Sequence, residues 1–199
     1  DEFIDIVKAM LHTKIYPDFI TIDGAEGGTG AAPLEFIDYM GMALADGLIF
    51  VSKVLKEYGL RDQIKIMASG KIITGFDIAK AMSLGADACY SARGMMFALG
   101  CIQALQCDSG KCPVGIATQD KNLYKGLDIT DKSVRVAHFH NNTLKAFAEF
   151  IGACGFDSPK AITPDVFYRR IDHKTNESFA SLFFNNYENK TKTEKINLN

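Results

Sequence analysis

Apolar residues recur along this chain with two alternating periods. Their spacing in EFIDIVKAMLH predicts an amphipathic helix over residues 2–12, and Pro17 separates this helix from the next segment. Short β-rich apolar runs then predict buried parallel strands, with helical spacing between and after them. The predicted strands are 19–23, 64–70 and 86–94, and the later helices are 34–58 (broken near Gly41 and Gly47), 76–84 and 132–151.

The order of these elements predicts the fold class. Strands that alternate with helices are typical of an α/β protein with a parallel sheet and right-handed crossovers. Each predicted strand runs into a glycine-containing loop, at the edge where (β/α)8 barrels and open α/β sheets bind ligands. The interval from residue 19 to residue 94 fits three successive βα units. Two interpretations stay open: a small three-stranded unit, or the end of a larger barrel.

Composition limits the classes of function. The chain has 199 residues, 47% hydrophobic and 23% charged, which suits one ordinary globular domain. Its formal net charge of −2 gives no indication of a nucleic-acid partner or an acidic membrane surface. No apolar run reaches the length of a membrane span, and no secretory signal is recognisable. Five cysteines without such a signal favour a reducing, cytoplasmic location over disulfides.

Two loops combine glycine with a basic residue. SGK at 69–71 and SARG at 91–94 each follow a predicted strand and precede a helical segment. Backbone N–H groups in such loops suit a phosphate, and Lys71 and Arg93 add positive charge. In many phosphate-binding barrels the last two strands carry this site. Either glycine alone is typical of an ordinary turn, but the matched pair favours phosphate binding.

The loop GAEGGTGAAP at residues 24–33 leaves two interpretations open. It holds four glycines and one charged residue, Glu26. A flexible turn between strand and helix explains it as well as a backbone surface against a flat ligand does. In the second interpretation, Asp23 and Glu26 orient donor groups of the ligand.

Three cysteines lie within the sixteen residues GCIQALQCDSGKCPVG, at Cys-x5-Cys-x4-Cys spacing. Thiolates bind zinc and iron–sulfur clusters. The stretch lacks the paired Cys-x2-Cys of common zinc sites and the four-cysteine pattern of common [4Fe–4S] clusters. Three thiolates suit a three-iron cluster, and inert thiols are the alternative. Cys89 and Cys154, distant in sequence, are assigned to packing.

These loops together resemble the FMN-binding (synthase) domain of the glutamate synthase family. The resemblance runs from about residue 18 to residue 155. In the family, three cysteines at this spacing, followed by Pro, Val-Gly and Ala-Thr-Gln, ligate a [3Fe–4S] cluster. The matching stretches are DGAEGGTGAAP at 23–33, ASGKIITGFDIAKAMSLGAD at 68–87, SARG at 91–94 and LGCIQALQCDSGKCPVGIATQD at 99–120.

The resemblance implies a fold and a set of site residues. The fold is the last three βα units of a (β/α)8 TIM barrel, plus an iron–sulfur segment and a helical C-terminal tail. No catalytic residue is identified. The implied FMN contacts, phosphate loops included, are Ser69, Gly70, Lys71, Ala92, Arg93, Gly94, Gly27 and Gly28, and the implied cluster ligands are Cys101, Cys107 and Cys112.

The resemblance also implies a reaction. In the family, ammonia from glutamine condenses with 2-oxoglutarate, and reduced FMN passes hydride to 2-iminoglutarate, giving glutamate. The cluster feeds electrons to FMN from a donor such as ferredoxin or a reductase subunit. The implied function is therefore an FMN- and iron–sulfur-dependent oxidoreductase that reduces 2-iminoglutarate, or a related imine of an oxo acid, in amino-acid biosynthesis.

Two departures weaken the assignment of 2-oxoglutarate. The family usually has His-Asp before Gly-Gly-Thr-Gly, where this chain has Ala25 and Glu26. It usually has Ala-Glu-Thr-His after a Gly-Leu, with the Glu lining the active site, where this chain has Phe50 and Ser52 at the acid and His positions. An apolar ring neither positions an imine nor exchanges protons. The chain is closer to short, standalone glutamate-synthase-like flavoproteins, which lack the amidotransferase domain.

The resemblance divides the chain into three parts. We expect residues 1–155 to hold the C-terminal part of the FMN-binding barrel, with the cysteine segment at 99–120. Residues 156–184 should form a helical or irregular cap, and the polar composition of 185–199 predicts disorder. We expect such a piece to need the remaining N-terminal barrel and to associate through exposed strand edges. Two other hypotheses are a phosphate-binding α/β module without redox activity, its cysteines inert or bound to zinc, and an inactive fragment of a larger flavoenzyme.

Overall fold

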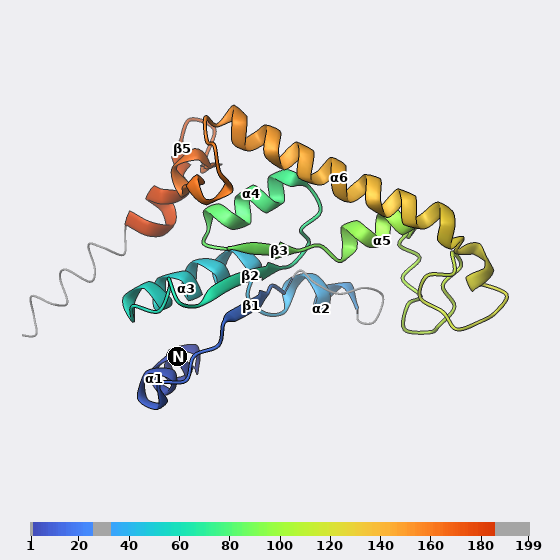
Figure 1. Ribbon diagram of the computed structural model, residues 1–199, viewed down its shortest axis with the longest axis horizontal. Coiled ribbons are helices and arrows are strands. Elements are labelled where there is room, and N and C mark those ends of the chain that lie inside the picture. The colour runs from blue at the N-terminus through green and yellow to red at the C-terminus, as the bar shows by residue number, and fades with distance from the viewer. Residues whose placement is uncertain (1, 26–32, 186–199) are drawn as a thin grey trace, which may run out of the picture.

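A three-stranded parallel sheet lies at the centre of the molecule. The computed structural model describes residues 2–25 and 33–185. The strands lie side by side in chain order (Figure 1), and the predicted α/β class with a parallel sheet is confirmed. They are β1 (Phe19–Asp23), β2 (Lys65–Ser69) and β3 (Ala88–Tyr90).

Helices precede, connect and follow these strands. The long helix α6 packs on both α4 and α5 and lies above them in Figure 1. No helix in the described ranges is long and apolar enough to cross a lipid bilayer. The helices are α1 (Glu2–Thr13), α2 (Leu34–Tyr39), α3 (Leu44–Glu57), α4 (Gly75–Ser83), α5 (Arg93–Leu99) and α6 (Ile129–Ala153).

The predicted break near Gly47 is wrong, because this glycine lies inside α3. A Cβ atom at Gly47 would lie 3.0 Å from Cγ2 of Ile22 on β1. The glycine therefore allows α3 to approach the sheet closely. The other predicted break, near Gly41, is confirmed by the turn between α2 and α3.

One face of the sheet is covered and the other is open. Ile66 and Ala68 of β2 are fully buried with Leu48 and Leu55 of α3, while α4 contacts β3. Because strand residues alternate between the two faces, their neighbours point to the other side. That side, the open face, is exposed or half-buried in the part of the chain that the structure describes. Its residues are Phe19, Thr21, Asp23, Lys65, Met67, Ser69, Ala88 and Tyr90.

A salt bridge between Arg61 and Asp87 lies at the amino edge of the sheet. The guanidinium of Arg61 lies 2.9 Å from the carboxylate of Asp87 and donates a 2.8 Å hydrogen bond to the carbonyl of Gly85. The same carboxylate accepts a 2.8 Å bond from the backbone N–H of Ile66. These bonds fix the turn after α4 to the start of β2.

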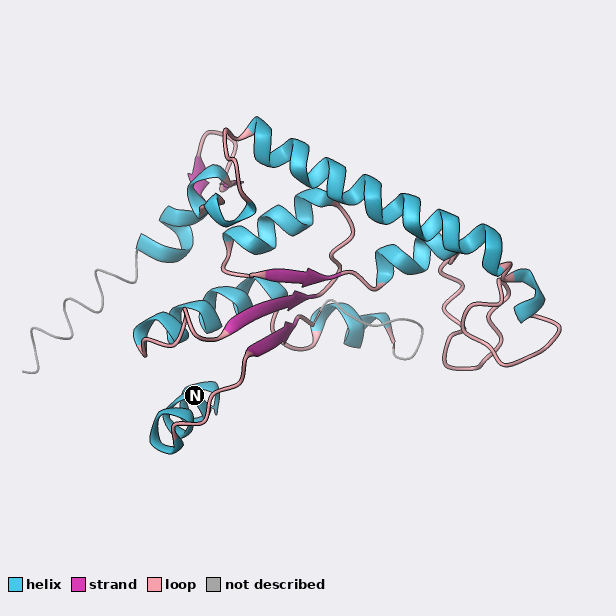
Figure 2. Ribbon diagram, viewed as in Figure 1, coloured by secondary structure: helices cyan, strands magenta, loops and turns pink. Residues whose placement is uncertain are grey.

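The region after α6 contains an antiparallel hairpin that sequence patterns did not predict. Its strands, YRR and NES, show no alternation of apolar residues. The hairpin lies beside the C-terminal end of α6 (Figure 2). The elements there are two 3-10 turns (Pro159–Ala161 and Pro164–Val166), β4 (Tyr168–Arg170), β5 (Asn176–Ser178) and a π-helix, η4 (Ala180–Asn185).

Aromatic rings attach this region to the rest of the fold. The ring centroid of Phe167 lies 5.5 Å from that of Phe76 on α4 and 5.6 Å from that of Phe150 on α6. Phe179 stacks on Phe167 at 5.6 Å. The predicted cap is thus packed onto α4 and α6, while the predicted polar tail lies outside the described residues beyond Asn185.

Candidate functional site

The candidate site lies at the carboxyl edge of the sheet, where all three strands end. Asp23 pairs in register with Ser69, and Ser69 pairs with Tyr90. The backbone N–H of Gly24 extends this pairing by donating a 2.7 Å hydrogen bond to the carbonyl of Ser69. The loops that follow the strands therefore leave the sheet side by side, as predicted.

The loop after β2 holds a residue in an unusual backbone conformation. Lys71 has φ of 48°, in the left-handed region that side chains other than glycine rarely adopt. Such a conformation costs about 1–3 kcal/mol and is concentrated at ligand sites. Gly70 precedes it with φ of 148°. Both residues line a pocket of about 180 Å³ between α3 and α4.

The loop after β3 is tied to the loop after β2. The hydroxyl of Ser91 donates a 2.7 Å hydrogen bond to the carbonyl of Ile72. Ala92 is the N-cap of α5, and Arg93 is its first residue. The structure therefore brings both predicted phosphate loops to one edge.

Gly94 has a packing role. A Cβ atom there would lie 2.7 Å from Oγ of Ser91 and 3.1 Å from ring atoms of Phe139 on α6. A side chain would force the Ser91 loop or α6 to shift. The missing Cβ thus permits the close contact between α5 and α6, whatever binds at the loop.

The glycine-rich loop after β1 is described only at its two ends. Gly27 and Gly28, the predicted flavin contacts, lie outside the described residues, as does Glu26. The backbone N–H of Ala25 donates a 2.9 Å hydrogen bond to the carbonyl of Met42. The loop therefore starts against the junction of α2 and α3.

The cysteine segment forms a long irregular loop between α5 and the 3-10 turn Tyr124–Gly126. Gln103 and Leu105 have φ of 56° and 52°, again in the left-handed region. A Cβ atom at Gly115 would lie 2.5 Å from the carbonyl oxygen of Leu123, so the loop closes on itself there. Irregular loops of this length are uncommon in compact folds and are usually either functional or linker segments.

Cys112 is a buried residue whose sulfur is surrounded by backbone N–H groups. Its side chain is 7% exposed. The backbone N–H of Ala117 lowers the pKa of the Cys112 thiol, burial opposes this, and the N–H groups of Val114, Ile116 and Gly115 lower it further. Hydrogen bonds to sulfur are among the means by which proteins tune iron–sulfur clusters. The surroundings of this sulfur therefore fit a cluster ligand.

The three predicted ligands are not assembled into one metal site. Within residues 2–25 and 33–185, no group of three or more His, Cys, Asp or Glu side chains is arranged to hold a metal ion. Cys101 and Cys107 are half-buried, and Cys101 follows the left-handed cap Gly100 at the end of α5. The three cysteines are of the residue type that ligates an iron–sulfur cluster, but the structure does not arrange them around one site.

The two remaining cysteines lie elsewhere. Cys89 packs against the core, and burial raises the pKa of its thiol to about 11. Cys154 caps the end of α6. All five cysteines are free. The packing role predicted for Cys89 agrees with this placement.

Phe50 and Ser52 lie in helix packing on α3. The ring of Phe50 meets that of Phe3 on α1 at 6.0 Å. Ser52 is 1% exposed, its hydroxyl has no hydrogen-bond partner, and a Cβ atom at Gly85 would lie 2.6 Å from its Oγ. The resemblance implied that the acid position, here Phe50, lines the active site. In the structure Phe50 packs on α1, and Ser52 lies against the turn at Gly85.

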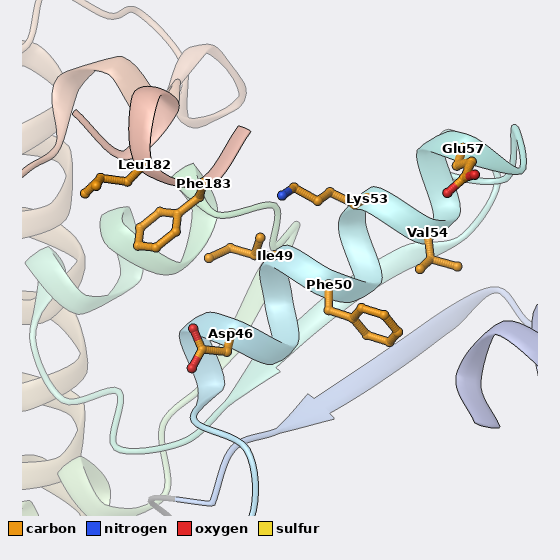
Figure 3. Close-up of a pocket in the computed structure, with 8 residues that line it drawn as sticks. All are labelled: Asp46, Ile49, Phe50, Lys53, Val54, Glu57, Leu182 and Phe183. Carbon is orange, nitrogen blue, oxygen red and sulfur yellow. The ribbon is translucent and has the colours of Figure 1, made fainter. Parts of the chain in front are cut away.

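A second pocket, of about 240 Å³, lies between α3 and the C-terminal π-helix (Figure 3). Asp46, Lys53 and Glu57 of α3 supply its charged groups, and Leu182 and Phe183 form part of its apolar wall. None of the predicted cofactor residues is among those that line it. This pocket is separate from the carboxyl edge.

Comparison with known proteins decides the family. Residues 2–157 match the family model described as the conserved region in glutamate synthase. The chain belongs to the glutamate synthase family. The resemblance inferred from the sequence is confirmed.

Two family members show how much of a relative this chain represents. The glutamate synthase large subunit-like protein YerD of Bacillus subtilis (strain 168) is 43% identical over 173 residues, which are 86% of this chain and 33% of YerD. An archaeal glutamate synthase (NADPH) of Methanocaldococcus jannaschii is 41% identical over 145 residues, which are 73% of this chain and 28% of that protein. The chain thus spans about a third of these family members.

Solved structures give a weaker likeness. A flavocytochrome b2 double mutant with pyruvate bound aligns with a TM-score of 0.44 and 17% identity, over 81% of this chain and 36% of that chain. At this level the likeness carries no argument. Assignment to the glutamate synthase family rests on the sequence comparisons.

Proposed function

We propose that this chain holds the phosphate of FMN in an oxidoreductase of the glutamate synthase type. The observation that carries the proposal is the pairing of two loops, 69–71 and 91–94, which leave adjacent parallel strands and are tied by the bond from Ser91 to Ile72. Their backbone N–H groups suit a phosphate, and Lys71 and Arg93 supply positive charge. Family membership supports FMN as the group that carries this phosphate.

The proposed reaction is reduction of an imine of a 2-oxo acid, with 2-iminoglutarate as the leading candidate. FMN, when bound, supplies the hydride. The two loops hold its phosphate, which fixes the ligand against the carboxyl edge of the sheet. The open face supplies polar side chains there and apolar ones, such as Met67, further along the strands.

The open face supports the further proposal that barrel strands outside this chain complete the site. Parallel sheets are usually buried on both faces. Here Phe19 and Tyr90 are 50% and 49% exposed on the open face. Within the described residues, β1 and β3 each pair on one side only. Further strands would cover the face and remove both unpaired edges.

We also propose a [3Fe–4S] cluster on Cys101, Cys107 and Cys112. The support is their spacing and the N–H donors around the sulfur of Cys112. Assembly of the three thiols would then accompany cluster binding. A bound cluster transfers single electrons, and ferredoxin or a reductase subunit is the proposed source. The free thiols of all five cysteines support a reducing, cytoplasmic location.

Cofactor analysis tests the proposal. The complete protein that contains this chain should be purified without oxygen and analysed for FMN, iron and acid-labile sulfide. We expect a yellow-brown protein with one FMN and three irons per chain. A Cys112→Ser variant should lose iron and keep FMN, because the loops and the cysteine segment are separate. A colourless protein that contains zinc would instead favour a phosphate-binding module without redox activity.

A further inference from the structure

The last residues of the three strands form a polar row across the open face. Asp23, Ser69 and Tyr90 are register partners on β1, β2 and β3. Asp23 and Tyr90 are exposed, and Ser69 is half-buried. Because neighbouring strands lie about 4.8 Å apart, a carboxylate, a hydroxyl and a phenol follow one another across about 10 Å. We refer to these three residues as the polar row.

The polar row differs from the rest of the open face. The next row along the strands is Thr21, Met67 and Ala88, which carries no charge. Among the eight residues of the open face, Asp23 is the only acid. The only base is Lys65, at the opposite end of β2 and about 13 Å from Ser69 along the strand. The negative charge on this face is therefore confined to the edge where the phosphate loops begin.

The two sets of charges at this edge suit different parts of the reacting molecules. Lys71 and Arg93 lie in the loops that directly follow Ser69 and Tyr90, and they suit anionic groups. Asp23 ends the neighbouring strand and suits a cation. The imine in the proposed reaction is cationic when protonated, and the amino acid that it becomes is cationic at the same nitrogen.

We propose that Asp23 binds the charged nitrogen of the substrate and that the hydroxyl of Tyr90 donates a hydrogen bond to the carboxylate of the substrate. The inference rests on the proposed function and names the residues that select its substrate. Bound, reduced FMN would supply two electrons as hydride to the carbon of the iminium, and the π electron pair of the C=N bond would move to nitrogen. The nitrogen would then take a proton from solvent and become an ammonium. Asp23 therefore lies beside a cationic nitrogen both in the substrate and in the product.

A comparison of two ligands isolates the role of Asp23. L-Glutamate carries the ammonium group, and 2-oxoglutarate has the same carboxylates without it. Their affinities for the FMN-loaded protein should be measured by calorimetry in the wild type, in Asp23→Asn and in Asp18→Asn. Asp18 is a matched control, because it is an exposed aspartate just before the other end of the same strand.

We expect Asp23→Asn to weaken glutamate binding by about tenfold to a hundredfold, since it removes a hydrogen bond between two charged groups. Binding of 2-oxoglutarate and FMN content should stay unchanged. Asp18→Asn should behave as the wild type does. Asp23→Glu keeps the charge and should retain the preference for glutamate over 2-oxoglutarate.

Several results would overturn the inference. One is a wild-type protein that holds FMN but does not bind glutamate. Another is an Asp23→Asn variant whose affinity for glutamate is unchanged, or whose affinities for glutamate and 2-oxoglutarate fall equally. If Asp23→Asn loses FMN or fails to fold, a folded Asp23→Glu protein without a preference for glutamate would overturn it too. A wild-type protein without FMN would contradict the proposed function itself. If the wild type holds FMN, a failed prediction counts only against the role of Asp23.

Discussion

The two sides of the small parallel sheet are built differently. On the covered side, Arg61 and Asp87 close the amino edge with bonds of 2.8–2.9 Å, and the helix-facing residues of β2 are fully buried. At the carboxyl edge, Lys71 takes a left-handed conformation in the loop after β2, and Asp23 and Tyr90 of the open side are exposed. Barrel proteins commonly separate stability and binding between the amino and carboxyl edges in this way. The contrast predicts that substitutions at the amino edge and on the covered side change stability, whereas those at the carboxyl edge change binding.

The largest effect on stability is expected at the amino edge. Asp87→Ala removes the anionic partner of Arg61, which keeps its bond to the carbonyl of Gly85, and leaves the Ile66 N–H without the carboxylate. We expect a loss of about 2–3 kcal/mol in the free energy of unfolding, less than the 3–5 typical of fully buried pairs, because both side chains are partly exposed. Urea denaturation measures it. Lys8→Ala, in an exposed pair with Asp5, is the control and should change stability by less than about 0.5 kcal/mol.

The next effect concerns the covered side at high pH. Burial raises the pKa of Cys89 to about 11, from 9.0 for an unperturbed thiol. The folded state keeps the proton that the unfolded state loses, so stability is fully present below pH 9 and falls as pH rises through 11. We expect this residue to account for a loss of about 1–2 kcal/mol by pH 11. A Cys89→Ala variant, less stable at pH 7, should lose less stability between pH 8 and pH 11, and equal slopes would contradict the assignment.

A smaller effect is expected where the two phosphate loops are tied. Ser91→Ala removes the hydrogen bond to the carbonyl of Ile72. We expect about 1 kcal/mol less stability and weaker FMN binding, because the loop after β3 loses its fixed position. Thermal unfolding and FMN titration measure the two quantities. Ser133→Ala, which removes a local bond within α6, is the control and should leave FMN affinity unchanged. Unchanged FMN affinity in Ser91→Ala would show that the tie does not shape the site.

The smallest effect on stability is expected at Lys71, with the opposite sign. Glycine adopts the left-handed conformation without the penalty of a side chain, so Lys71→Gly should stabilise the protein by about 0.5–1 kcal/mol. The same change removes a positive charge from the site and should weaken FMN binding. A Lys71→Gly variant that is less stable and binds FMN as tightly as the wild type would contradict the expected separation of stability and binding. Urea denaturation and FMN titration on one sample decide between these results.

The sequence predicted the parallel sheet better than the region after α6. The run FITID predicted β1 with its observed bounds, because an apolar, β-rich segment between polar turns has few alternatives. The hairpin of YRR and NES was missed, since its stability comes from Phe167, which packs on α4 and α6, and from Phe179, which stacks on Phe167. Contacts of this kind between distant aromatic residues produce no periodic spacing of apolar residues in the sequence.

The site was predicted in part for a similar reason. The meeting of the two loops at one edge was predicted because glycine and a basic residue follow each strand directly, and phosphate binding by them stays a prediction. The polar row of Asp23, Ser69 and Tyr90 depends on register between strands, which the sequence does not state. The role of the Phe50 position stays a prediction, since a motif comparison gives a position in the chain and not the direction of a side chain. The arrangement of the three cysteine thiols stays a prediction.

Discrimination between FMN and riboflavin tests the central claim most directly, since the two ligands differ only by the phosphate. Their dissociation constants should be measured on the complete protein, for wild type, Lys71→Ala/Arg93→Ala and the control Lys8→Ala. We predict that wild type prefers FMN by about a hundredfold or more and that the double variant loses most of this preference, because charge-assisted bonds to phosphate are removed. The control should keep it. An undiminished preference for FMN in the double variant would contradict the account.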